Sequence, residues 1–113
     1  MKTVRFMGSA KDDLSAFPKL VRIRAGHELF MVQAGRAPDD WKSMGTVGPG
    51  ACEIRVRDRT GAFRVIYVAR FEDAVYVLHA FEKKSRKTSQ ADLDLARRRY
   101  REARDLARGA NRG

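Results

Sequence analysis

The chain has 113 residues, which is enough for one small domain with a single hydrophobic core and excludes a second core of similar size. Its formal net charge of +10, from 24 Lys and Arg against 14 Asp and Glu, indicates a polyanionic partner, with nucleic acid as the first candidate. The single cysteine excludes an internal disulfide, and the two histidines are too far apart in sequence for a zinc-ligand spacing. No segment has the pattern of a signal peptide or of a membrane span. We therefore expect a cytoplasmic protein without metal, cofactor or membrane partner.

The first third of the chain predicts a strand and two helices. Residues 3–7 alternate in the β manner and stop at a glycine. Ser9 and Asp12 have the spacing of a capping box, which predicts a short helix over 10–16 that ends before a proline. Proline then suits the first turn of a second helix, over 18–34, which ends at a glycine. We expect the two helices to pack together against a flat surface.

The middle of the chain predicts a loop and a β-meander. Residues 36–50 are rich in glycine and proline and predict a loop, with Trp41 and Met44 as its anchors in the core. Alternating, β-rich segments separated by turn residues follow, and they predict three antiparallel strands over 51–58, 62–71 and 74–81. Alternation places three charged side chains of the first of these strands on one face, namely Glu53, Arg55 and Arg57.

A long helix closes the chain. Thr88 or Ser89 is the expected cap. Aspartates lie in the first turns, where the helix dipole stabilises negative charge. Helical periodicity predicts one apolar stripe, made of Leu93, Ala96, Tyr100, Ala103 and Ala107. We expect residues from about 109 to 113 to be frayed.

Basic residues gather where the last strand leads into this helix. Residues 83–113 hold eleven Lys and Arg against four acids. Basic side chains at a strand-to-helix junction suit phosphate binding, which points to RNA, and the residues at this junction are His79, Lys83, Lys84, Arg86, Lys87, Arg97 and Arg98.

The order of the predicted elements resembles the fold of RelE/ParE-type toxins of bacterial toxin–antitoxin modules, in particular the phage-derived, HigB-like branch. The resemblance is carried by FPKLVRIRAG at 17–26 and by residues 48–99, which include LHAFEKKSRKT at 78–88. It implies a single α+β domain over 1–113 with a RelE-like fold. That fold has an antiparallel sheet of about four strands, two N-terminal helices and a C-terminal helix.

The resemblance also implies a function. It suggests a metal-independent endoribonuclease that cleaves messenger RNA on the 70S ribosome, inhibits translation, and is silenced by a helix-turn-helix antitoxin. Two alternatives remain open, a ParE-like inhibitor of DNA gyrase and a nucleic-acid-binding protein without catalysis. Codon-phased cuts in mRNA would favour the nuclease, whereas DNA breaks with intact mRNA would favour the gyrase inhibitor.

Site residues follow from the same resemblance, position by position. Arg55 and Arg57 stand where RelE-type enzymes carry paired basic residues on the first hairpin strand. Arg64 corresponds to the arginine that contacts the scissile phosphate. Lys83 falls at the basic position that helps to stabilise the transition state.

Several residues have two interpretations. His79 is the one group near this cluster that titrates around neutral pH, so it either transfers a proton or is a buried structural residue on the face of Val75, Val77 and Phe81. Lys84 and Lys87 either contact RNA or belong to a solvated basic face. Glu53 is either a general base or, as we favour, an ion-pair partner of the hairpin arginines.

The pattern departs from RelE-type nucleases in one respect. Those enzymes carry a tyrosine shortly after the last strand, whereas this chain has none between Val77 and Arg99. Tyr100 lies on the apolar stripe of the final helix. The general acid or base is therefore unassigned.

Trp41 and Tyr67 either stack on a nucleic-acid base or belong to the core. We expect the single cysteine, Cys52, to be inert packing.

Overall fold

Five strands and three helices follow one another along the chain. The computed structural model describes residues 1–112, with side chains up to residue 110. The elements are β1 (Thr3–Phe6), α1 (Ala10–Ser15), α2 (Lys19–Gln33), β2 (Trp41–Ser43), β3 (Ala51–Asp58), β4 (Gly61–Val68), β5 (Ala74–Lys83) and α3 (Gln90–Arg112). The α+β class, the two N-terminal helices and the C-terminal helix agree with the prediction.

The sheet differs from the predicted one in strand number and direction. Its order is β1-β5-β4-β3-β2, so it has five strands rather than about four. β1 runs parallel to β5, which makes the sheet mixed, not antiparallel throughout. Residues 41–43, which we predicted as loop, pair with β3 as an edge strand. Local alternation identifies a strand but does not reveal which strand lies beside it, and three residues are too few to show alternation at all.

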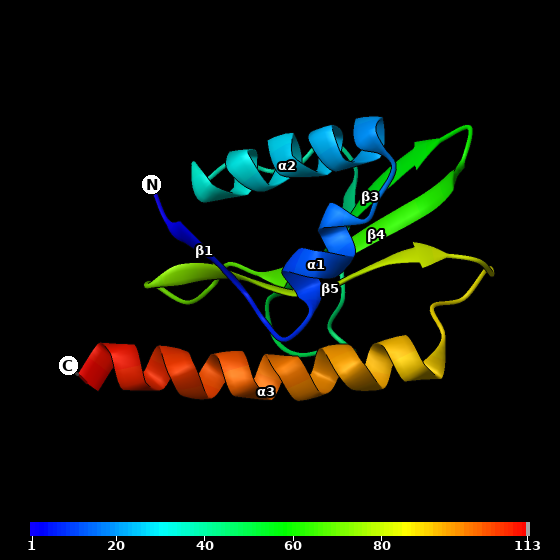
Figure 1. Ribbon diagram of the computed structural model, residues 1–113. Helices are drawn as coiled ribbons and strands as arrows, with labels where there is room; N and C mark the ends of the chain where they lie inside the picture. Colours follow the sequence, from blue (N-terminus) through cyan, green and yellow to red (C-terminus); the bar gives the residue numbers. More distant parts are fainter. Residues whose placement is uncertain (113) are drawn as a thin grey trace.

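The sheet lies between two helical layers (Figure 1). α1 and α2 cover one face, where Leu14, Val21 and Leu29 pack on Ile54 and Val65. α3 covers the other face with four residues of the predicted stripe, Ala96, Tyr100, Ala103 and Ala107. Tyr100 is a core residue, as expected, and its hydroxyl donates to the carbonyl of Pro49 at 2.6 Å. No described helix is both long and apolar enough to cross a membrane.

A β-bulge in β5 changes which side chains share a face. Ile66 pairs with His79 but its neighbour Tyr67 pairs with Val77, so Leu78 is an extra residue. Before the bulge, Val75 and Val77 face α2; after it, His79 lies on the α3 face. Our placement of His79 on the face of the two valines is therefore wrong, because alternation fails across a bulge.

The ends of the elements correct smaller predictions. Ser89 is the cap of α3, since its Oγ accepts from the Asp92 amide at 3.1 Å. Ser9 makes no such bond at α1, so the predicted capping box is absent there. Trp41 is 42% exposed rather than a core anchor, whereas Met44 is buried as predicted. α3 is helical to Arg112, beyond the expected fraying point near 109, and residue 113 lies outside the described residues.

Candidate functional site

The hairpin end of the sheet carries basic side chains on its α3 face. Arg55 pairs across the sheet with Arg64, and Arg57 pairs with Ala62, which in turn pairs with Lys83. Residues paired across antiparallel strands point to the same face, so the four predicted cations share one surface. The bulge is what brings Lys83 to that surface.

Arg64 forms a buried ion pair with Glu53. The Glu53 side chain is completely buried, and its Oε1 lies 3.4 Å from Nε of Arg64, which is 6% exposed. Neither carboxylate oxygen has a hydrogen-bond partner among the described residues. Burial and the neighbouring guanidinium groups of Arg55 and Arg57 lower the pKa of Arg64, and the Glu53 carboxylate opposes this. Glu53 is thus an ion-pair partner of one hairpin arginine, Arg64.

Beside this pair lies a pocket of about 440 Å³ that we call the basic pocket. β2, the end of β5 and the loop before α3 contribute to its wall, and four cations line it: Lys42, Lys83, Arg86 and Lys87. No acidic residue lines the pocket. Desolvation and the charge of Arg64 lower the pKa of Lys83. Lys42 has an ionic contact with Glu53 behind the pocket wall, and Lys83, Arg86 and Lys87 form no ion pair among the described residues. Such a concave cationic surface suits a phosphate group.

The structure brings some predicted site residues into this pocket and leaves others outside it. Lys83 and Lys87 line it, whereas Lys84 is exposed elsewhere on the same loop. Arg55 is held by Asp40, with Nη2 2.8 Å from Oδ1, at the margin of the site. Arg57 is exposed near the hairpin turn.

Sequence reasoning missed Lys42 as a site residue. Its Nζ lies 3.9 Å from Glu53 Oε1, because β2 pairs Lys42 with Glu53. The one available signal was a lysine among turn residues, which does not distinguish a site from a solvated loop. Arg86 belonged to the predicted basic junction but not to the predicted site.

His79 is largely buried and contributes to the wall of a pocket of about 590 Å³ between α1 and the end of β5, which is separate from the basic pocket. The residue is 6% exposed, its Nε2 lies 2.7 Å from Asp92 Oδ1, and its ring stacks on Phe81 with centroids 4.7 Å apart. Its Nδ1 is buried and has no partner among the described residues. Its burial and its contact with Asp92 favour the structural interpretation, and the catalytic role of His79 stays a prediction.

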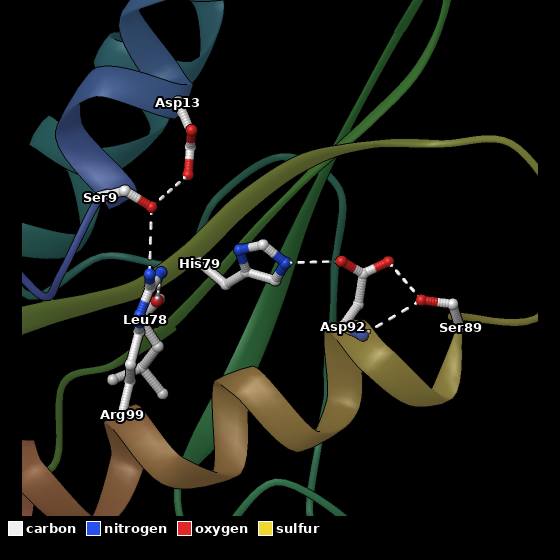
Figure 2. A network of polar contacts seen from close by, with 7 residues as sticks. All are labelled: Ser9, Asp13, Leu78, His79, Ser89, Asp92 and Arg99. Carbon is white, nitrogen blue, oxygen red and sulfur yellow. Dashed lines mark hydrogen bonds and ion pairs between the residues drawn. The ribbon is translucent and has the colours of Figure 1, made fainter.

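Two residues of α3 hold the bulge in place (Figure 2). Asp92 contacts His79, and Arg99, seven residues further along α3, donates through Nη1 to the carbonyl of Leu78 at 3.0 Å. The other nitrogen, Nη2, donates to Ser9 Oγ at 3.0 Å, which ties α1 to the same point. The absence of a side chain at Gly8 leaves space for the Arg99 guanidinium, because a Cβ at this position would lie 2.7 Å from the Arg99 Nε atom.

We expect Arg99→Met to lower the free energy of unfolding by about 2 kcal/mol, because a buried carbonyl and a hydroxyl each lose a charged donor. Urea unfolding followed by far-UV circular dichroism measures the change. The matched control is Arg98→Met on the exposed side of the same helix, expected within about 0.5 kcal/mol of wild type. Equal effects of the two substitutions would contradict the role assigned to Arg99.

The aromatic and cysteine candidates lie apart from the basic pocket. Trp41, Cys52 and Tyr67 line a separate pocket of about 350 Å³, and by register they face the α2 side of the sheet. Burial raises the pKa of the Cys52 thiol, so little reactive thiolate forms, in keeping with inert packing.

Comparison with known proteins gives one family. Residues 12–101 match the family described as "Phage derived protein Gp49-like (DUF891)". The match spans every residue of the basic pocket, the Glu53–Arg64 pair and the two α3 residues that hold the bulge. No curated protein matches the chain.

Proposed function

The chain belongs to the Gp49-like family of phage-derived proteins, a toxin-like family related to RelE and HigB toxins in general, and we propose that it is a ribosome-dependent mRNA endoribonuclease of a type II toxin–antitoxin module. The observation that carries the proposal is the basic pocket beside Arg64, a cavity of about 440 Å³ that four cations line. The fold alone would not distinguish a nuclease from a binding protein.

The proposed reaction is attack of a ribose 2′-hydroxyl on the adjacent phosphodiester. The bond between the 2′-oxygen and phosphorus forms, and the bond between phosphorus and the 5′-oxygen breaks. The 2′-oxygen loses a proton, and the leaving 5′-oxygen gains one. Positioning and stabilisation of the charged transition state are the main requirements, and cationic side chains meet both.

We assign the roles from position and burial. Arg64 is buried beside the basic pocket, held by Glu53 and not part of the pocket wall, and in the proposal its guanidinium binds the scissile phosphate. Lys42, Arg86 and Lys87 bind phosphate oxygens in the basic pocket. The remaining predicted cations, Arg55, Arg57 and Lys84, contact flanking RNA.

Proton transfer is assigned to Lys83. It lines the basic pocket and its pKa is lowered, whereas His79 does not line that pocket and its Nε2 is bonded to Asp92. A lowered pKa increases the neutral fraction that accepts a proton near neutral pH. In the proposal His79 serves to fix the strand that carries Lys83.

We expect Lys83→Arg to reduce the cleavage rate by about 100-fold or more, because arginine keeps the charge but does not give up a proton. In the wild type the rate should rise with pH through the lowered pKa of Lys83, since the neutral amine is the active form, and this rise should vanish in Lys83→Arg. Rates measured on ribosome-bound mRNA between pH 6 and 10 test both points. Lys84→Arg is the matched control and should keep the wild-type rate. Full activity of Lys83→Arg would mean that Lys83 contributes its positive charge and does not transfer a proton.

Brief expression of the protein in growing bacteria tests the function. Primer extension should show cuts phased with codons and new 5′-hydroxyl ends, and purified protein should cut the same mRNA only when 70S ribosomes are added. DNA breaks with intact mRNA would instead indicate gyrase inhibition. If both mRNA and DNA stayed intact, the result would indicate a nucleic-acid-binding protein without catalysis.

The proposal includes a silencing partner. We expect an antitoxin of helix-turn-helix type encoded beside this chain, since the related toxins are paired in that way. Its co-expression should restore growth, which a growth curve of the two-plasmid strain measures. An adjacent reading frame without such a pattern, and without rescue, would contradict this part.

A further inference from the structure

α2 presents an apolar face to the outside of the molecule. Leu20, Ile23 and Phe30 are 68, 55 and 50% exposed, although Val21, Ala25, Leu29 and Val32 already bury the opposite face of the helix on the sheet. Half of the six large, exposed hydrophobic residues of the described chain therefore lie on one helix face. In Figure 1, α2 forms the outer layer, with no element beyond it. An apolar face of this kind on a surface helix marks an interaction site.

The exposed residues form a narrow seam. Leu20, Ile23, His27 and Phe30 follow one another at spacings of three, four and three residues, the repeat of a coiled-coil contact. The seam is about 15 Å long and covers about 80° of the helix circumference. We call these four residues the α2 seam. Its width suits one partner helix.

The seam has positive borders. Lys19 and Arg22 lie on one side and Arg24 on the other, and no acidic side chain of the described residues forms an ion pair with them. Each arginine donates one exposed hydrogen bond to a backbone carbonyl, Arg22 to that of Ser15 at 3.3 Å and Arg24 to that of Arg57 at 2.9 Å. The single acid of α2, Glu28, is buried and accepts from the Asp39 amide.

From this combination we propose that the α2 seam binds an acidic amphipathic helix of another protein. Apolar residues of that helix would cover Leu20, Ile23 and Phe30, and its glutamates and aspartates would face Lys19, Arg22 and Arg24. This interaction does not depend on RNA cleavage, since the seam and the basic pocket lie on opposite faces of the sheet.

Charge and shape distinguish this partner from two others. A second copy of the chain would bring two sets of positive borders together, in a protein whose net charge is already +10. An anionic membrane would satisfy the cations, but a helix at a membrane surface buries a broad apolar face. The broad apolar face of α2 is buried on the sheet, so that only the narrow α2 seam is exposed.

The test uses a designed probe. A fluorescent 21-residue peptide carries leucine at the a and d heptad positions and glutamate at e and g, where mutual repulsion keeps it monomeric. A second peptide replaces every glutamate with lysine. Fluorescence anisotropy with the full-length protein should show binding of the acidic peptide at micromolar concentrations and binding of the basic peptide at least tenfold weaker.

Variants locate the binding. Ile23→Asp should weaken binding of the acidic peptide at least tenfold, while Leu106→Asp, at a 46% exposed position on α3, should leave it unchanged. Both sites are exposed, and circular dichroism confirms that the variants fold. RNA cleavage should be the same in both variants, so loss of cleavage activity and loss of the helix site are separate results.

Four outcomes would overturn the proposal. They are equal or absent binding of the two peptides, equal effects of the two substitutions, a dimer in analytical ultracentrifugation that Ile23→Asp dissociates, and co-sedimentation with phosphatidylserine vesicles that Ile23→Asp abolishes. The last two would assign the seam to a second copy or to a membrane.

Discussion

Arg64→Lys is expected to lower the rate of mRNA cleavage by about 100-fold or more while the protein remains folded. Arg64 directs Nε at Glu53 and donates through Nη1 to the Phe63 carbonyl, which leaves Nη2 for a phosphate oxygen. Lysine keeps a positive charge next to the buried Glu53 carboxylate but cannot serve these partners and a phosphate from one rigid plane. Removal of one donor from a charged transition state costs about 100- to 1,000-fold in other enzymes. Rates on ribosome-bound mRNA and growth after induced expression both measure the effect.

The choice of lysine follows from the burial of Arg64. Alanine would leave Glu53 as a buried charge without its main partner, so loss of growth arrest by Arg64→Ala would combine a folding defect with a catalytic one. Arg101→Lys on the exposed side of α3 is the matched control. Unchanged cleavage by Arg64→Lys, with unchanged stability, would remove Arg64 from the phosphate-binding role.

Much of the fold could be predicted because most elements bury one face. β3 was predicted with its observed bounds, 51–58, since apolar and charged residues alternate along its sequence. The stripe of α3 was predicted because the helix packs one side on the sheet and exposes charges elsewhere. α2 is different. It is apolar on two sides, so its pattern did not reveal that Leu20, Ile23 and Phe30 would be exposed.

The site was harder to predict because its geometry depends on pairing between distant segments. VYVLHAF reads as a regular strand, and nothing in it marks Leu78 as the extra residue that turns His79 and Lys83 to the α3 face. The bulge is stabilised by Arg99 from α3, 21 residues away in sequence. Lys42 reaches the site through β2, whose pairing with β3 places it opposite Glu53. Neither contact has a local sequence signal.

Arg64 also shows why a polar residue in a strand need not be exposed. Its strand, β4, is buried over 63–68, and alternation within FRVIYV predicts an outward arginine. The structure instead buries the guanidinium beside Glu53, 11 residues earlier, on the neighbouring strand. A buried charge needs a partner of opposite sign, and that partner is what positions the arginine.

Glu53→Gln is expected to lower the free energy of unfolding by about 3 kcal/mol, because the amide keeps the shape of the side chain but leaves the Arg64 charge buried without compensation. Urea unfolding measures the loss. Asp94→Asn removes one partner of an exposed ion pair, with Arg97, and should cost at most about 0.5 kcal/mol. Equal losses of unfolding free energy in the two variants would mean that the Glu53–Arg64 pair stabilises the fold no more than an exposed ion pair does.

The double variant Glu53→Gln/Arg64→Met separates the stabilising role of the pair from its chemical role. With both charges gone, no buried charge is left uncompensated, so the double variant should lose about 2 kcal/mol less than the sum of the two single losses. Its cleavage activity should nevertheless be as low as that of Arg64→Met alone, because no guanidinium faces the phosphate. Additive stability losses would show that the two side chains do not interact, and activity in the double variant would show that catalysis does not need Arg64. The expected combination, stability regained without activity, would mean that Glu53 acts on RNA cleavage only through the arginine that it positions.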